Sequence, residues 1–108
     1  MNAIDKCTVK NTSDVSGNPA GGFVLGTGIL IAWQNGPLGR GETRRRPNGA
    51  FVETVIAAAL QRLEYYQAGK FACEENACAI DLLNHALLEL NHRTAHREMR
   101  GVEGTHEV

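Results

Sequence analysis

The chain of 108 residues has few aromatic residues, three prolines and no long hydrophobic run. Phe, Trp and Tyr make up 6% of it, and a small domain buries only about two thirds of its unfolded surface. The core that one chain can form is therefore small. The strongest apolar run, Gly28 to Trp33, has the length of a strand, whereas a membrane-spanning helix needs about 20 residues. The sequence thus excludes a multidomain machine and predicts no association with a membrane.

Signals for secretion and for disulfide bonding are also missing. The amino terminus has no basic region followed by an apolar stretch, so we expect a cytoplasmic protein without a secretory signal. Three cysteines cannot all pair within one chain, and Cys73 and Cys78 point in different directions in a helical pattern. We expect buried, reduced thiols with a structural role.

The charge is nearly balanced, with 11 basic and 12 acidic residues and a net charge of −1. This balance makes nucleic acid an unexpected partner, because proteins that coat it carry a positive excess. Seven of the eight arginines nevertheless fall in two clusters, at 40–46 and at 93–100. Arginine presents a planar fork of donors to phosphate oxygens, so the clusters suggest a compact anionic ligand. Solvated surface arginines are the alternative.

The order of patterns predicts an α+β fold, in which a small N-terminal antiparallel β-sheet is followed by a long two-helix hairpin. Residues 1–22 form a flexible or short-strand segment, with a short strand near Ala3–Lys10 and a loop at Ser13–Gly22. Residues 23–108 are expected to form the main domain, a β-strand followed by the helical hairpin. It opens with a second strand at Phe23–Trp33, which is rich in β-branched residues.

Two helices follow from apolar residues that recur every three or four positions. The first is expected from Phe51 to about Gln67, with Asn48 as its cap and Gly69 in a left-handed conformation after it. The second runs from about Ala72 to Met99, and the stripe that packs on the first helix comprises Asn76, Ile80, Leu83, Leu87, Leu90 and Thr94. More apolar residues lie outside that stripe than one helix can cover. We therefore expect a homo-oligomer, since a second copy is the simplest partner.

Metal binding and catalysis are both weakly supported. One face of the second predicted helix carries titratable side chains at spacings that metal ligands on a helix also show: Asp81, His85, His92 and His96. Arg93 and Arg97 beside them would repel a cation, so a hydrated polar face is favoured and no metal or other cofactor is expected. No arrangement of residues indicates acid–base or nucleophilic catalysis. The sequence predicts a binding protein and not an enzyme.

An arginine row is the most distinctive local pattern. Arg93, Arg97 and Arg100 stand at i, i+4 and i+7, beside the apolar stripe, and the row contains no acidic residue. Such a row indicates an anion supplied from elsewhere. The pattern leaves two sources open, a ligand phosphate or a carboxylate of a neighbouring subunit.

Three sequence segments resemble a known family: WQNGP at 33–37, LEYYQAGKFACEEN at 63–76 and LNHRTAHREMRGVEGT at 90–105. They are similar to the phage anti-defence sponges, hairpin-domain proteins that counter Thoeris or cyclic-oligonucleotide (CBASS) immunity. The resemblance implies a homodimer, or a hexamer, that sequesters a cyclic ADP-ribose-type (glycocyclic ADP-ribose) signalling nucleotide in the infected host's cytoplasm without degrading it. The alternatives are a cyclic-oligonucleotide sponge and a small oligomeric nucleic-acid-binding regulator that uses Arg40 to Arg46.

The same resemblance implies the residues that bind the ligand: Tyr66, Asn76, Arg93, Thr94 and Arg97. Tyr66 would stack on the base and Asn76 would read it, while the two arginines, with Thr94 between them, would hold the phosphates. One position departs from the family pattern, because Glu74 stands where relatives carry an arginine that helps to bind cyclic trinucleotides. The departure implies weak or absent binding of cyclic trinucleotides here.

Overall fold

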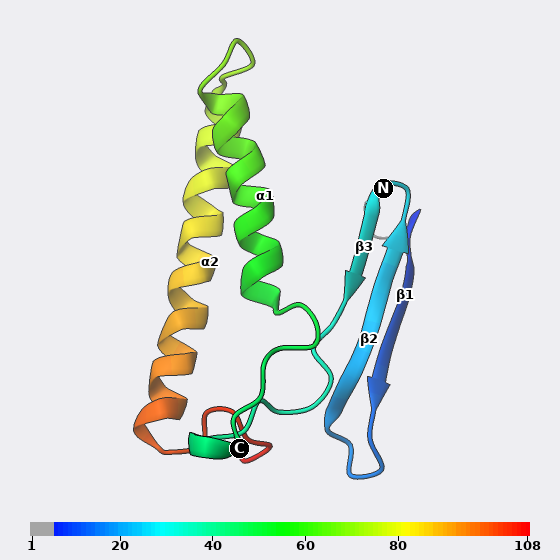
Figure 1. The fold of residues 1–108 in the computed structure, drawn as a ribbon. Coiled ribbons are helices and arrows are strands. Elements are labelled where there is room, and N and C mark those ends of the chain that lie inside the picture. Colours follow the sequence, from blue (N-terminus) through cyan, green and yellow to red (C-terminus); the bar gives the residue numbers. More distant parts are fainter. Residues whose placement is uncertain (1–5) are drawn as a thin grey trace. The chain divides into compact units, whose positions relative to one another are not determined.

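The computed structural model describes residues 6–108, which divide into two compact units. The first unit holds the chain up to Phe51 together with Val102–Val108, and the second holds Val52–Gly101. Three strands and a short 3-10 helix, η2 (Gly41–Thr43), come first, and two long helices follow (Figure 1). This order confirms the predicted α+β class of sheet followed by helical hairpin.

The sheet of the first unit is antiparallel, with its strands in the order β1 (Thr8–Ser13), β2 (Pro19–Gly26) and β3 (Ile29–Ala32). In the register, Val24 lies opposite Val9 on one side and opposite Ile31 on the other. These three β-branched residues share one sheet face, because side chains alternate along a strand. Val24, at 6% exposure, is the buried centre of that face.

The sheet corrects two predictions about the strands. The single strand expected at Phe23–Trp33 is wrong, because the chain reverses after Gly26 and returns as β3. Gly28 in this turn has a φ of +76°, which glycine adopts at low cost. The loop expected at Ser13–Gly22 is too long, since β2 already begins at Pro19. Of the strand expected at Ala3–Lys10, residues 8–10 lie in β1, and residues 3–5 lie outside the described part.

The turn between β1 and β2 is closed by one carboxylate. Asp14 accepts hydrogen bonds from the backbone N–H groups of Ser16, at 2.8 Å, and Asn18, at 3.0 Å. The bond from the Asn18 backbone is the main reason why the pKa of Asp14 lies below its ordinary value. An aspartate-centred turn of this kind fixes the hairpin locally without a hydrophobic core.

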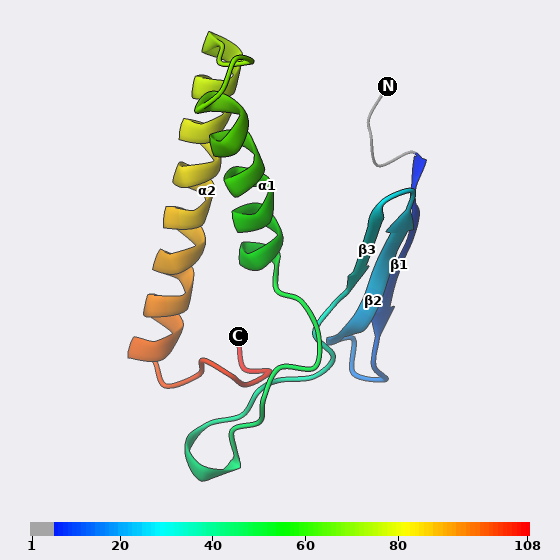
Figure 2. The same cartoon turned by 45° about the horizontal axis from the view of Figure 1, so that its top comes forward.

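The second unit is an antiparallel helical hairpin of α1 (Val52–Gln67) and α2 (Glu74–Met99), which lie side by side in Figures 1 and 2. Both helices begin within two residues of their predicted starts and end at their predicted last residues. Leu60 of α1 is buried at 9% exposure. The predicted stripe of α2 is sheltered along its whole length, whereas Leu82, outside it, is 69% exposed.

Details at the helix ends differ from the predictions. Asn48 does not cap α1, because its side chain accepts the Asn35 backbone N–H and donates to the Asn35 carbonyl. Gly69 has no positive φ, whereas Gly101, just after α2, does at +73°. The expectation of buried thiols is also wrong for Cys73 and Cys78, which are free and exposed.

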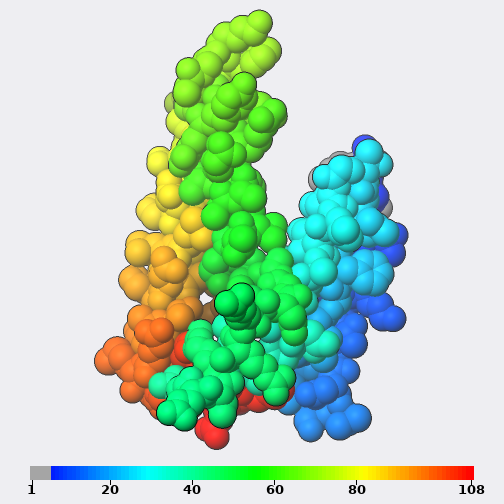
Figure 3. Space-filling model, viewed as in Figure 1, coloured from blue at the N-terminus to red at the C-terminus, as the bar shows by residue number. Residues whose placement is uncertain are grey.

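The apolar core of the described chain is thin. Val24 in the first unit and Leu60 in the second are the buried hydrophobic residues among residues 6–108. Thirteen large hydrophobic side chains are exposed, among them Leu30 on β3 at 75%. Figure 3 shows one face of this surface, on which α1 (green) lies against the yellow part of α2. Within residues 6–108, neither helix has the length and apolar character that crossing a bilayer demands.

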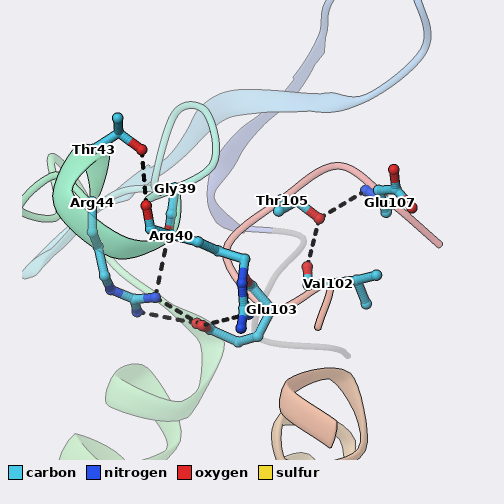
Figure 4. Close-up of polar contacts among 8 residues, drawn as sticks. All are labelled: Gly39, Arg40, Thr43, Arg44, Val102, Glu103, Thr105 and Glu107. Carbon is cyan, nitrogen blue, oxygen red and sulfur yellow. Dashed lines mark hydrogen bonds and ion pairs between the residues drawn. The ribbon is translucent and has the colours of Figure 1, made fainter. Parts of the chain in front are cut away.

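A polar clasp ties the C-terminal segment to the connector after β3, within the first unit (Figure 4). Glu103 accepts two hydrogen bonds from Arg44, at 2.7 and 3.0 Å, and its carbonyl accepts one from Arg40 at 2.8 Å. The Gly39 N–H donates to the Gly104 carbonyl at 2.7 Å. The backbones approach so closely that a Cβ on Gly104 would collide with the Gly39 carbonyl.

Candidate ligand-binding site

The tip of the hairpin positions the first two candidate residues. Tyr66 lies in the last turn of α1 and is 38% exposed, and Asn76 lies in the first turn of α2. The Gln67 side chain accepts the Cys73 N–H at 3.0 Å and donates to the Cys73 carbonyl at 2.9 Å. Asn76 donates through Nδ2 to the Phe71 carbonyl at 3.3 Å, which leaves its Oδ1 as an acceptor. The two amides fix the loop from both helices, so the tip is an ordered platform.

An arginine contacts the aromatic residues of this platform. The guanidinium of Arg62 lies 4.8 Å from the ring centroid of Tyr65 and 4.9 Å from that of Tyr66. Sequence reasoning did not identify Arg62, although its spacing of three and four residues from the tyrosines is the spacing of helical neighbours. The i, i+3, i+4 spacing of Arg62, Tyr65 and Tyr66 could therefore have indicated this contact.

The open end of the hairpin positions the other three candidates on the last turns of α2. The Arg93 guanidinium lies 3.5 Å from the Glu53 carboxylate, measured from Nη2 to Oε1. Thr94 donates its hydroxyl hydrogen to the Leu90 carbonyl at 3.2 Å, so its oxygen can still accept a bond. Arg97 lies one turn further along and is half-buried. This end therefore carries the guanidinium groups of Arg93 and Arg97 and the hydroxyl group of Thr94.

The contact with Glu53 corrects the reading of the arginine row. The anion that contacts Arg93 is a carboxylate of the same chain. This source was not among the two that the sequence left open, which were a ligand phosphate and a carboxylate of a neighbouring subunit. An antiparallel hairpin brings the first turn of α1 to the last turns of α2, so Glu53 was identifiable in the sequence. The pair is solvent-exposed, with the Arg93 side chain 62% accessible, and such pairs contribute about 0–1 kcal/mol. Breaking this ion pair therefore costs little free energy.

The five candidates thus form two groups and not one pocket within a chain. Asn76 and Arg93 are 17 residues apart on α2, which at 1.5 Å per residue is about 25 Å. Tyr66 and Asn76 share the tip, while Arg93, Thr94 and Arg97 share the open end. A dinucleotide-sized ligand cannot bridge the two groups on one hairpin.

Other sequence candidates find little support in the geometry. Among residues 6–108, no three His, Cys, Asp or Glu side chains lie close enough together to hold a metal ion. The predicted helical face with His85, His92 and His96 therefore forms no such group. In the other arginine cluster, Arg40 and Arg44 both contact Glu103, which neutralises part of its charge. The candidate site is therefore the hairpin, with its aromatic tip and its basic open end.

These features define a class of protein, a small helical-hairpin domain with aromatic side chains at its tip and arginines at its open end. The family model described as the Acb2/Tad1 hairpin domain matches residues 27–95, and the chain belongs to this family. A curated relative, Thoeris anti-defense 1 of Bacillus phage SBSphiJ7, is 49% identical over 77 residues. The alignment covers 71% of this chain and 51% of the relative, so the chain spans about half of that relative's length.

The family assignment confirms the resemblance inferred from the three sequence segments. The matched range includes four of the five candidate residues, and Arg97 lies two residues beyond its end. Both ends of the candidate site therefore fall within or next to the part of the chain that the family shares.

Proposed function

We propose that this protein is a phage anti-Thoeris sponge, which binds a cyclic ADP-ribose-type signalling nucleotide and withholds it without degrading it. The observation that carries the proposal is the family match, because it covers the hairpin that holds both Tyr66 and Arg93. The relative named as a Thoeris anti-defense protein supports the biological direction. Sequestration in the host cytoplasm would keep the signal from its effector.

Each end of the hairpin supplies what one part of such a ligand needs. The exposed Tyr66 ring offers a face to adenine, and stacking of one base contributes about 1–3 kcal/mol. Asn76 offers the Oδ1 acceptor to an amino group of the base. Arg93 and Arg97 offer charge-assisted hydrogen bonds to the pyrophosphate, each worth about 1.5–3 kcal/mol. These contacts give tight capture with no catalytic group.

The separation of the two ends leads to a two-chain pocket. If all five residues hold one ligand, two hairpins pack antiparallel, so that the tip of one meets the open end of the other. Two-fold symmetry then creates two equivalent pockets per dimer. The exposed apolar side chains of α2, Leu82 and Leu88, support this association, because a second copy would cover them. Dimers of this kind can assemble further into hexamers.

The proposal is tested by asking whether bound nucleotide is recovered intact. The protein is incubated with each glycocyclic ADP-ribose isomer, filtered to remove free nucleotide, and then denatured by heat, and the released material is analysed by chromatography. We expect depletion of one isomer from the filtrate and its full recovery after heating. Recovery of a degraded product would indicate a hydrolase. No depletion of any isomer, together with a gel shift of nucleic acid at physiological salt, would favour the nucleic-acid-binding alternative.

A further inference from the structure

The tip of the hairpin carries a charge–aromatic cluster, defined by Arg62, Tyr65 and Tyr66. The Cζ atom of Arg62 lies 4.8 Å and 4.9 Å from the two ring centroids. The centroids are 6.0 Å apart and the ring planes are inclined at 55°. One guanidinium therefore contacts both tyrosines at once.

Within this cluster, a hydrogen bond joins Arg62 to Tyr66. The Nε–H of Arg62 donates to the phenol oxygen of Tyr66, with 3.2 Å between nitrogen and oxygen. Two contacts with one ring, at its face and at its hydroxyl, restrict the side-chain torsions of Tyr66. An exposed tyrosine without such contacts moves among its rotamers within nanoseconds.

We propose that Arg62 is a positioning residue of the ligand site, which holds the Tyr66 ring in the orientation that receives the base. The role of Tyr66 rests on the proposed function, whereas the contact itself belongs to the free protein. The ring keeps 38% exposure in this arrangement, so surface remains for a flat base. A ring that is ordered before binding loses less conformational entropy when the ligand arrives, and affinity rises accordingly.

Arginine is specifically required by this arrangement. Its planar guanidinium stacks on aromatic rings and its Nε–H donates from within the plane, whereas lysine has a compact ammonium group at the end of a flexible chain. Arg62→Lys keeps the charge but loses the planar stack and the Nε bond to Tyr66. If Arg62 acts through its charge alone, Arg62→Lys should behave like the wild-type protein. If Arg62 acts by holding the Tyr66 ring, Arg62→Lys should lose this effect.

The first experiment examines the free protein by NMR with ¹³C-labelled tyrosine. The chain has two tyrosines, so Tyr65→Phe and Tyr66→Phe assign both ring signals. We expect nuclear Overhauser contacts between the Arg62 side chain and both rings, and a lower order parameter of the Tyr66 ring in Arg62→Gln. The exposed neighbour variant Gln61→Ala should leave the ring unchanged. Absence of the contacts, or an unchanged Tyr66 order parameter, would overturn the proposal.

The second experiment measures affinity for the glycocyclic ADP-ribose isomer that binds the wild-type protein. Arg62→Gln should weaken binding about fivefold, the size of one exposed cation–π contact, and Arg62→Lys should not restore it. In a Tyr66→Phe background the loss should be smaller, because the hydroxyl bond is already missing. An equal loss in both backgrounds would show that Arg62 acts on the ligand directly and would refute the positioning role. If no isomer binds the wild-type protein, the proposed function fails, and the NMR result alone decides the role of Arg62.

Discussion

The tip and the open end of the hairpin differ in chemistry and in how firmly their side chains are held. At the tip, the Tyr66 hydroxyl accepts a hydrogen bond from Arg62, and the Asn76 side chain donates one to the Phe71 carbonyl. At the open end, Arg93 has one long contact with Glu53 and is largely exposed. In the proposed function, the tip would receive the flat, uncharged base and the exposed open end would offer its charge to the phosphates.

This difference is the basis of the proposed two-chain pocket. α2 has 26 residues and α1 has 16, so the last turns of α2 extend beyond α1. Arg93 still reaches Glu53 in the first turn of α1, Arg97 lies one turn further along α2, and the aromatic platform lies at the opposite end of the hairpin. In the proposed pocket, an antiparallel second copy brings its platform to this basic end.

The largest effect is expected when one variant is damaged at the tip of the hairpin and a second variant is damaged at the open end. Tyr66→Ala and Arg97→Ala should each lose most binding, because each damages both pockets of its own dimer. Mixed in equal amounts with free subunit exchange, they should recover about a quarter of the wild-type sites, because half the dimers are mixed and each has one intact pocket. Calorimetry with the preferred isomer measures the number of sites directly.

The control for this experiment is a mixture of two variants damaged at the same end. Arg93→Ala mixed with Arg97→Ala should recover nothing, because every pocket then lacks one arginine. Exchange itself is confirmed by native mass spectrometry of the mixture. If subunits exchange and the tip–end mixture also recovers nothing, the two-chain pocket is wrong.

Much of this architecture could be predicted from the sequence, because the helical period is strong and local. Apolar residues at steps of three and four placed α1 and α2 within two residues, and Gly101 does follow α2 with a positive φ. The strands were harder. The residues from Phe23 to Trp33 are apolar or small, and their glycines suggest bends, but the composition does not show that the chain reverses completely at Gly28 to form a third strand.

The candidate site was predictable as a set of residues but not as a set of contacts. The positions of Tyr66, Asn76, Arg93, Thr94 and Arg97 came from a resemblance, and their separation followed from helix rise alone. The antiparallel hairpin and the helical spacing indicate Glu53 and Arg62 as neighbours of these residues, but the contacts themselves depend on side-chain rotamers, which periodicity does not fix. Asn48 illustrates the same limit. Asparagine often caps a helix, but here the Asn48 side chain forms hydrogen bonds with the Asn35 backbone instead.

The next effect concerns ligand class at the tip. Glu74 is an exposed residue in the first turn of α2, and in the proposed function its carboxylate would repel additional phosphates. We expect weak binding of a cyclic triadenylate by the wild-type chain and an increase of about tenfold in Glu74→Arg, the size of one charge-assisted bond. Calorimetry measures both, with Glu75→Arg as the control, because adjacent residues project about 100° apart on a helix. Submicromolar binding by the wild-type chain would contradict this interpretation.

A smaller effect is expected at the open end. Glu53→Gln removes the carboxylate that competes with ligand phosphate for Arg93, so affinity should rise about threefold at low salt and less at high salt. Binding curves at two ionic strengths test this. Glu103→Gln is the matched control, because it removes a carboxylate paired with arginines outside the hairpin and should leave affinity unchanged. Weaker binding in Glu53→Gln would mean that Glu53 orients Arg93 for the ligand.

The smallest effect should come from loosening the tip loop while leaving every candidate residue in place. Gln67→Ala removes both bonds between the Gln67 side chain and the Cys73 backbone, and each such bond contributes about 1 kcal/mol to stability. We expect faster hydrogen exchange at residues 68–73, a lower melting temperature and an affinity loss of about twofold, because the loop no longer fixes Asn76 relative to Tyr66. Exchange at residues 93–97 should not change. If it changed equally, the two ends would form one cooperative unit, and the contrast between an ordered tip and an adaptable open end would have to be abandoned.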